Sequence, residues 1–149
     1  MVRAPSVEDI DAARQAFETN EPRDLFYRAA TELVTLALDG KTSLSVAEAL
    51  AVLLQTWNKM FYQYRRFDNQ HFADIERLIS DHHSIPIAFR QRSIEGLNQE
   101  DEGEVARVFK AFEEVLGPVG AAKCLHLLAP RFFPLWDRAI AEAYGLPLR

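Results

Sequence analysis

The chain has 149 residues, of which 48% are hydrophobic and 26% are charged, which is the mix found in soluble globular proteins. This composition excludes disorder throughout, a collagen repeat and a coiled coil, and the length suits one domain over residues 1–149. The net charge of −5 argues against a surface that is basic throughout, as most phosphate-binding proteins have.

Three further features favour a cytoplasmic location. The longest apolar run, Ala49–Leu54, is much too short to span a bilayer, so no membrane contact is expected. No leader of basic and then apolar residues opens the chain, which argues against secretion. Cys124 is the sole cysteine, so an intrachain disulfide and a cysteine zinc cage are excluded, and we expect neither a metal nor another cofactor.

The whole chain is predicted to be helical, because apolar residues recur at three- and four-residue steps and no stretch alternates as a strand would. Ser6 with Asp9 and Ser45 with Glu48 are capping-box pairs that begin two of the helices. We expect a compact, all-α, single-domain bundle of about seven or eight short helices. Their expected extents are Val7–Glu18, Phe26–Ala37 ended by Gly40, Val46–Tyr64, Phe72–Ile79, Pro86 to near Gly96, Val105–Leu116, Ala121–Leu128 and Arg138–Tyr144.

A glycine-containing connection separates two of these helices. It reads Leu116-Gly117-Pro118-Val119-Gly120, and glycine allows the positive φ that a short reversal requires. Free backbone N–H groups at the start of the second helix can bind an anion such as phosphate. The alternative is a purely structural corner, in which Gly117 ends one helix and Gly120 lets the next one pack closely.

Val119-Gly120 is followed by Lys123 just inside the next helix, and a proline and then Asp137 precede the last helix. With these residues, the C-terminal segment resembles the helix-hairpin-helix DNA glycosylase superfamily. The resemblance implies that the hairpin holds the backbone of double-stranded DNA. It also implies that Lys123 attacks the sugar C1′ as a Schiff-base nucleophile, while Asp137 assists departure of the base. The expected DNA contacts are Gly117, Val119, Gly120 and Ala121, with Arg131 and Arg138 from the same locally basic segment.

Each expected catalytic residue also has a structural alternative. A nucleophilic lysine must be neutral, which requires burial against apolar walls. Lys123 would otherwise lie with its stem packed and its amine in water, and Asp137 would otherwise only cap the last helix. A flipped base needs aromatic or apolar walls, which residues such as Trp57 offer, although burial in the core is the usual role of an aromatic side chain.

Other candidates are weaker. His71, His82 and His83 lack the spacing of a metal site, and we expect a histidine to stabilise the end of the fourth helix instead. Cys124 is expected to be a small buried hydrophobe. The stretch Tyr64-Arg65-Arg66-Phe67 suits nucleic-acid contact, or it simply ends a long helix.

Two functions follow. The first is a DNA-glycosylase-like protein that binds DNA and excises or processes a damaged base through Lys123 and Asp137. It predicts that both side chains line a cleft. The second is a non-enzymatic helical interaction or scaffold protein, for instance a homodimer. It predicts that Lys123 is exposed on a flat surface and that the hairpin is only a corner.

Overall fold

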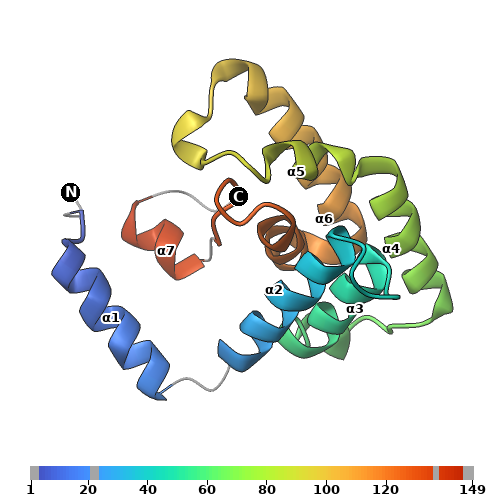
Figure 1. Ribbon diagram of the computed structural model, residues 1–149, viewed down its shortest axis with the longest axis horizontal. Coiled ribbons are helices and arrows are strands. Elements are labelled where there is room, and N and C mark those ends of the chain that lie inside the picture. Colours follow the sequence, from blue (N-terminus) through green and yellow to red (C-terminus); the bar gives the residue numbers. More distant parts are fainter. Residues whose placement is uncertain (1–3, 21–23, 136–137, 146–149) are drawn as a thin grey trace.

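The chain folds into helices alone in the part that the computed structural model describes, residues 4–20, 24–135 and 138–145 (Figure 1). The prediction of an all-α protein is therefore confirmed. The α-helices are α1 Val7–Asn20, α2 Asp24–Leu38, α3 Val46–Trp57, α4 Asn69–His82, α5 Ser84–Phe89, α6 Gln99–Leu128 and α7 Arg138–Ala143, with 3₁₀ turns η1 Phe61–Gln63 and η2 Ile94–Gly96.

The predicted capping box opens α3. The Ser45 hydroxyl accepts from the Glu48 backbone N–H at 3.1 Å, and the Glu48 carboxylate accepts from the Ser45 N–H at 2.7 Å. These bonds satisfy two of the backbone donors that a helix leaves free at its start. The helix then buries Leu50, Leu53 and Leu54 completely, and α2 packs along it.

The prediction that α3 continues to Tyr64 is wrong. Asn58 ends the helix with φ −115° and ψ 24°, and a single 3₁₀ turn follows. Tyr64 is 89% exposed, so the apolar stripe beyond Trp57 finds no core to cover. The chain leaves the helix there, and Phe61 packs against Gly117 instead.

The fourth helix is present as predicted, and the Asp68 carboxylate caps it by accepting from the His71 N–H at 3.0 Å. The helix expected from Pro86 to near Gly96 is shorter. It runs from Ser84 to Phe89. Pro86 lies in its first turn, where a proline is tolerated because its missing N–H would have no partner there.

The longest helix, α6, is sharply kinked. Gly117 alone departs from helical torsion angles, with φ 69° and ψ 168°, where we expected a connection of several residues up to Gly120. Pro118 then starts a second helical segment, as proline does at a first helical position. The two halves of α6 point in different directions (Figure 1).

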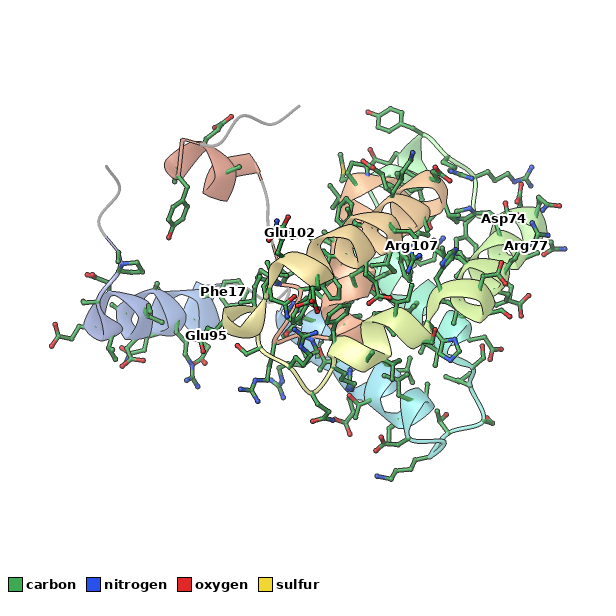
Figure 2. All side chains as sticks on the ribbon, turned by 90° about the horizontal axis from the view of Figure 1, so that it is seen from above. Phe17, Asp74, Arg77, Glu95, Glu102 and Arg107 are labelled. Carbon is green, nitrogen blue, oxygen red and sulfur yellow. The ribbon has the colours of Figure 1, made fainter. Side chains whose placement is uncertain are left out.

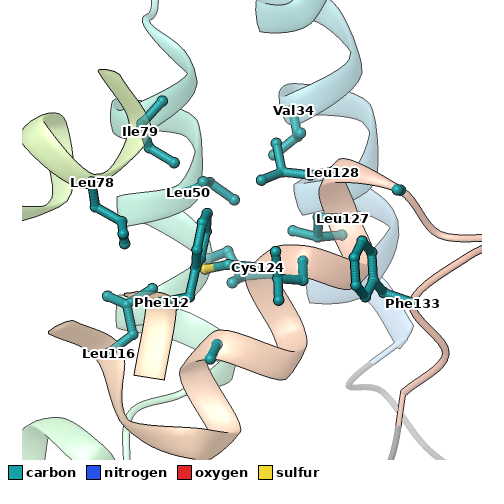
Figure 3. Close-up of a cluster of buried hydrophobic side chains, with 14 of the residues drawn as sticks. Val34, Leu50, Leu78, Ile79, Phe112, Leu116, Cys124, Leu127, Leu128 and Phe133 are labelled. Atoms are coloured by element: carbon teal, nitrogen blue, oxygen red, sulfur yellow. The ribbon is translucent and has the colours of Figure 1, made fainter. Parts of the chain in front are cut away.

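The second half of α6 is the central element of the core. Cys124, Leu125, Leu127 and Leu128 are all buried, as expected for a helix that is apolar on nearly every side. Figure 3 shows Cys124, Leu127 and Leu128 between side chains of α2, α3 and α4. Arg90 closes the C-terminal end of this segment, donating to the carbonyls of Leu127 at 3.0 Å and Leu128 at 2.7 Å.

Helices α1 and α7 lie to one side of this core (Figure 1). Every side chain from residue 7 to residue 19 is exposed. Ala141 of α7 is fully buried, whereas Tyr144 is 53% exposed. Among the described helices, none is long and apolar enough to cross a membrane.

Candidate functional site

The Lys123 amine is held at the end of α3. It donates to the carbonyl oxygen of Trp57 and lies 4.6 Å from the centroid of the Trp57 ring. The last carbonyls of a helix lack intrahelical partners and carry partial negative charge, and an aromatic face also attracts a cation. Both contacts therefore favour the charged ammonium form, and they keep Lys123 half-buried.

The same tryptophan lines an open apolar pocket. The walls that the structure describes are Phe17, Tyr27, Trp57 and Leu135, around about 400 Å³. The rings of Tyr27 and Trp57 meet edge to face with centroids 5.5 Å apart. Figure 2 shows Phe17 on α1, at the side of the molecule away from α4. An apolar pocket with aromatic walls suits a flat ligand.

A buried histidine fixes one wall of this pocket. The hydroxyl of Tyr27 lies 3.0 Å from Nε2 of His126, and Nδ1 of His126 lies 2.8 Å from the carbonyl oxygen of Phe133. A carbonyl only accepts, so Nδ1 carries the proton. His126 is 8% exposed, and its burial lowers its pKa and keeps the ring neutral.

The kink at Gly117 is covered by the segment after α3. A Cβ built on Gly117 would lie 2.8 Å from the Phe61 ring, so only glycine fits both the torsion angles and the space. Arg65 donates to the carbonyl of Val115 at 3.1 Å and lies 5.8 Å from the centroid of the Phe61 ring. The loop of residues 58–67 is therefore anchored beside the start of the second half of α6.

The predicted DNA contacts around the kink differ in exposure. Val119 is 57% exposed, but Ala121 is fully buried. Gly120 is also buried, because it packs against Leu116 and Asn58 with no space for a Cβ. Gly120 and Ala121 thus serve helix packing, and the surface at the kink consists of Gly117, Pro118 and Val119.

Residues 58–67, beside the kink, carry three cations, while the turn of α6 before the kink carries the exposed Glu113 and Glu114. Lys59, Arg65 and Arg66 are exposed, and residues 58–67 contain no acidic residue. None of the three forms an ion pair with a described residue. We call residues 58–67 the basic loop.

The remaining predicted site residues lie elsewhere or cannot be placed. Arg131 is exposed, and its backbone carbonyl accepts from the Ile94 N–H at 3.0 Å. It follows the C-terminal end of α6, whereas the kink lies at the start of the second half of that helix. Arg138 begins α7, but its side chain is outside the described part of the chain. Asp137 lies wholly outside the described residues.

His71 and His83 each make a hydrogen bond within the fold. No group of three or more His, Cys, Asp or Glu side chains among the described residues could hold a metal ion. His83 bonds the carbonyl of Ile79 through Nδ1 at 2.9 Å, which confirms a histidine at the end of the fourth helix. His71 is 3% exposed and bonds the Tyr62 hydroxyl at 2.9 Å, whereas His82 ends α4 half-buried.

Cys124 is the small buried hydrophobe that we expected. Burial raises the pKa of its thiol to about 12, so it stays protonated and unreactive.

The sequence reasoning missed Tyr27 and His126 as neighbours of the pocket. They are 99 positions apart, so no local spacing could bring them together. The polar His126 within the apolar run Cys124–Leu128 was the available signal, because a buried polar side chain needs a partner.

No protein-family model matches this chain, and comparison with curated proteins and with solved structures likewise gives no match.

Proposed function

We propose that this protein binds double-stranded DNA and receives an extrahelical base in the aromatic pocket beside Lys123, where the base is excised or processed. The observation that carries the proposal is the position of the Lys123 amine on Trp57, a residue that also lines the pocket. Lys123 does not itself line the pocket, but it shares Trp57 with it, so a cation for a phosphate and aromatic walls for a base are joined through one residue.

The basic loop supplies the second part of the argument. Its three exposed cations lie on a chain whose net charge is −5, and one of them, Arg65, lies beside the kink, where it bonds the Val115 carbonyl. Asp137 is the carboxylate that the proposal pairs with Lys123.

A binding experiment tests the proposal. We would measure binding of labelled duplexes, intact or carrying an abasic-site analogue, to the native chain, to Lys123→Ala and to Lys110→Ala. Lys110 is an exposed lysine on α6 and serves as the matched control. We expect tighter binding to the abasic duplex and a loss of about ten-fold for Lys123→Ala alone, because a charged contact contributes about 1–3 kcal/mol.

Borohydride trapping on a natural abasic site then addresses the chemistry. An adduct that disappears in Lys123→Ala would identify the lysine as a nucleophile. Binding without an adduct would leave it as a cation that attracts the DNA. If the native chain binds no duplex at low salt, the DNA proposal is wrong.

A second function has one observation in its favour. Helix α1 exposes Val7 by 74%, Ile10 by 54% and Phe17 by 47%, all from one stretch of a single helix. Such an apolar surface favours association with another protein or a second copy. Sedimentation velocity over a range of concentrations tests self-association, and a single monomeric species throughout would contradict it.

A further inference from the structure

The aromatic pocket carries hydrogen-bonding groups of fixed direction. Of its described walls, Phe17 and Leu135 have purely apolar side chains, whereas the side chains of Tyr27 and Trp57 each carry one polar atom. The Trp57 indole N–H can only donate. A tyrosine hydroxyl can donate or accept, so its role depends on its other partner.

His126 decides the role of the Tyr27 hydroxyl. Because the N–H at Nδ1 of His126 donates a hydrogen bond to the Phe133 carbonyl, Nε2 of the neutral ring carries no proton and can only accept. The Tyr27 hydroxyl, 3.0 Å away, must therefore be the hydrogen-bond donor to Nε2. Its oxygen lone pairs are then the only hydrogen-bonding part of the phenol that is left for a ligand.

We propose that Tyr27, oriented by His126, is a specificity-determining acceptor that selects bases carrying an N–H donor. The inference rests on the proposed function, since it assumes that the pocket receives a base. In a mainly apolar pocket, a donor on the base loses its water and binds well only where an acceptor awaits it. Conversely, a base without the donor leaves the phenol oxygen unpaired.

The test compares three purines at one position of a duplex, each opposite an abasic-site analogue. Adenine and 2-aminopurine carry an exocyclic amine, and unsubstituted purine carries none. We expect the native chain to bind at least one amino-substituted duplex about three- to ten-fold more tightly than the unsubstituted one, which is the range of one net hydrogen bond.

Two variants assign the preference to Tyr27. Tyr27→Phe keeps the ring and removes the acceptor, so the preference should vanish. Tyr62→Phe is the matched control, because Tyr62 also bonds a buried histidine, His71, but does not line the pocket. Tyr62 belongs to the basic loop, but its ring packs against the core, and the phosphates that the loop is proposed to bind are common to all three duplexes. This variant should keep the preference. The ratio between native and variant chains cancels differences in how readily each base leaves the stack.

Two results would overturn the inference. One is equal binding of the three purines by a native chain that still binds these duplexes more tightly than an intact one. The other is an amine preference that survives in Tyr27→Phe. A native chain that binds none of the duplexes would instead overturn the proposed function. Thermal unfolding of each variant shows whether it is folded when it is tested.

Discussion

Gly117 combines two constraints that each demand glycine. Its backbone lies at φ 69° and ψ 168°, a region that side chains make very unfavourable. The Phe61 ring also occupies the space that a Cβ would need. The kink thereby places the start of the second half of α6 beside Phe61 of the basic loop.

Gly117→Ala should therefore lower the free energy of unfolding by about 1–3 kcal/mol. Gly103→Ala is the control, because Gly103 lies in α6 with nothing within 4 Å of a Cβ. It should raise the free energy of unfolding by about 0.5–1 kcal/mol, since alanine favours helix. Urea denaturation measures both, and equal effects would contradict the account of the kink.

His71 and His126 make stability depend on pH. Burial lowers the pKa of both rings, and for His71 nearby Arg65 lowers it further while Asp74 and Asp68 oppose the shift. The unfolded chain therefore takes up protons at higher pH than the folded one. Stability is fully present above the unfolded pKa and is lost as the pH falls through and below it.

We expect the free energy of unfolding to decrease as the pH falls from about 7.5 to about 5.5. His71→Gln should make this decrease smaller, because one of the two buried rings is gone. Urea denaturation at several pH values measures the slope, and a flat profile in the native chain would show that the buried histidines do not matter.

At the scale of elements, the same capping box contributes differently to the stability of the protein in different helices. Ser6 with Asp9 and Ser45 with Glu48 both form reciprocal caps. However, α1 buries none of its side chains from residue 7 to residue 19, whereas α3 lies in the core. A cap stabilises the whole protein only where its helix is part of the cooperative unit.

Ser45→Ala should therefore lower the free energy of unfolding by about 1 kcal/mol. Ser6→Ala removes the same kind of cap from α1 and should leave the main unfolding transition unchanged. Chemical denaturation followed by circular dichroism compares the two. Equal losses would mean that α1 contributes to the core more than its exposure indicates.

For the whole molecule, the distribution of charge matters more than its sum. The net charge of −5 argued against nucleic acid, but Lys59, Arg65 and Arg66 form a local basic surface in a loop without acidic residues. Each phosphate neutralised by a cation releases counterions, so binding weakens as salt rises.

If the basic loop binds phosphates, Lys59→Ala with Arg66→Ala should reduce the slope of log K against log salt by about 2. Arg65 is left in place because it bonds Val115 and anchors the loop. Lys41→Ala with Arg107→Ala is the control, as each of these cations pairs with a nearby carboxylate. An unchanged slope in the loop variant would place the DNA elsewhere.

Periodicity and caps were enough to predict the helical class and most of the helices, because both depend on residues three or four positions apart. They did not predict the end of α3 at Trp57. The pattern continues to Tyr64, but no core lies above the later residues. The pattern did predict a break at the glycines. It did not predict that Gly117 alone leaves the helical torsion angles, because the close packing of Gly120 against Asn58 depends on tertiary contacts that the local sequence does not show.

The amino-acid order therefore determined which stretches are helical, where a helix must break and which residue types are available for chemistry. The tertiary structure alone decided that Lys123 lies on Trp57 and that His126 meets Tyr27. These pairs are separated by 66 and 99 positions, so their contacts depend on how the helices pack and not on any local pattern. The candidate site was assembled by that packing.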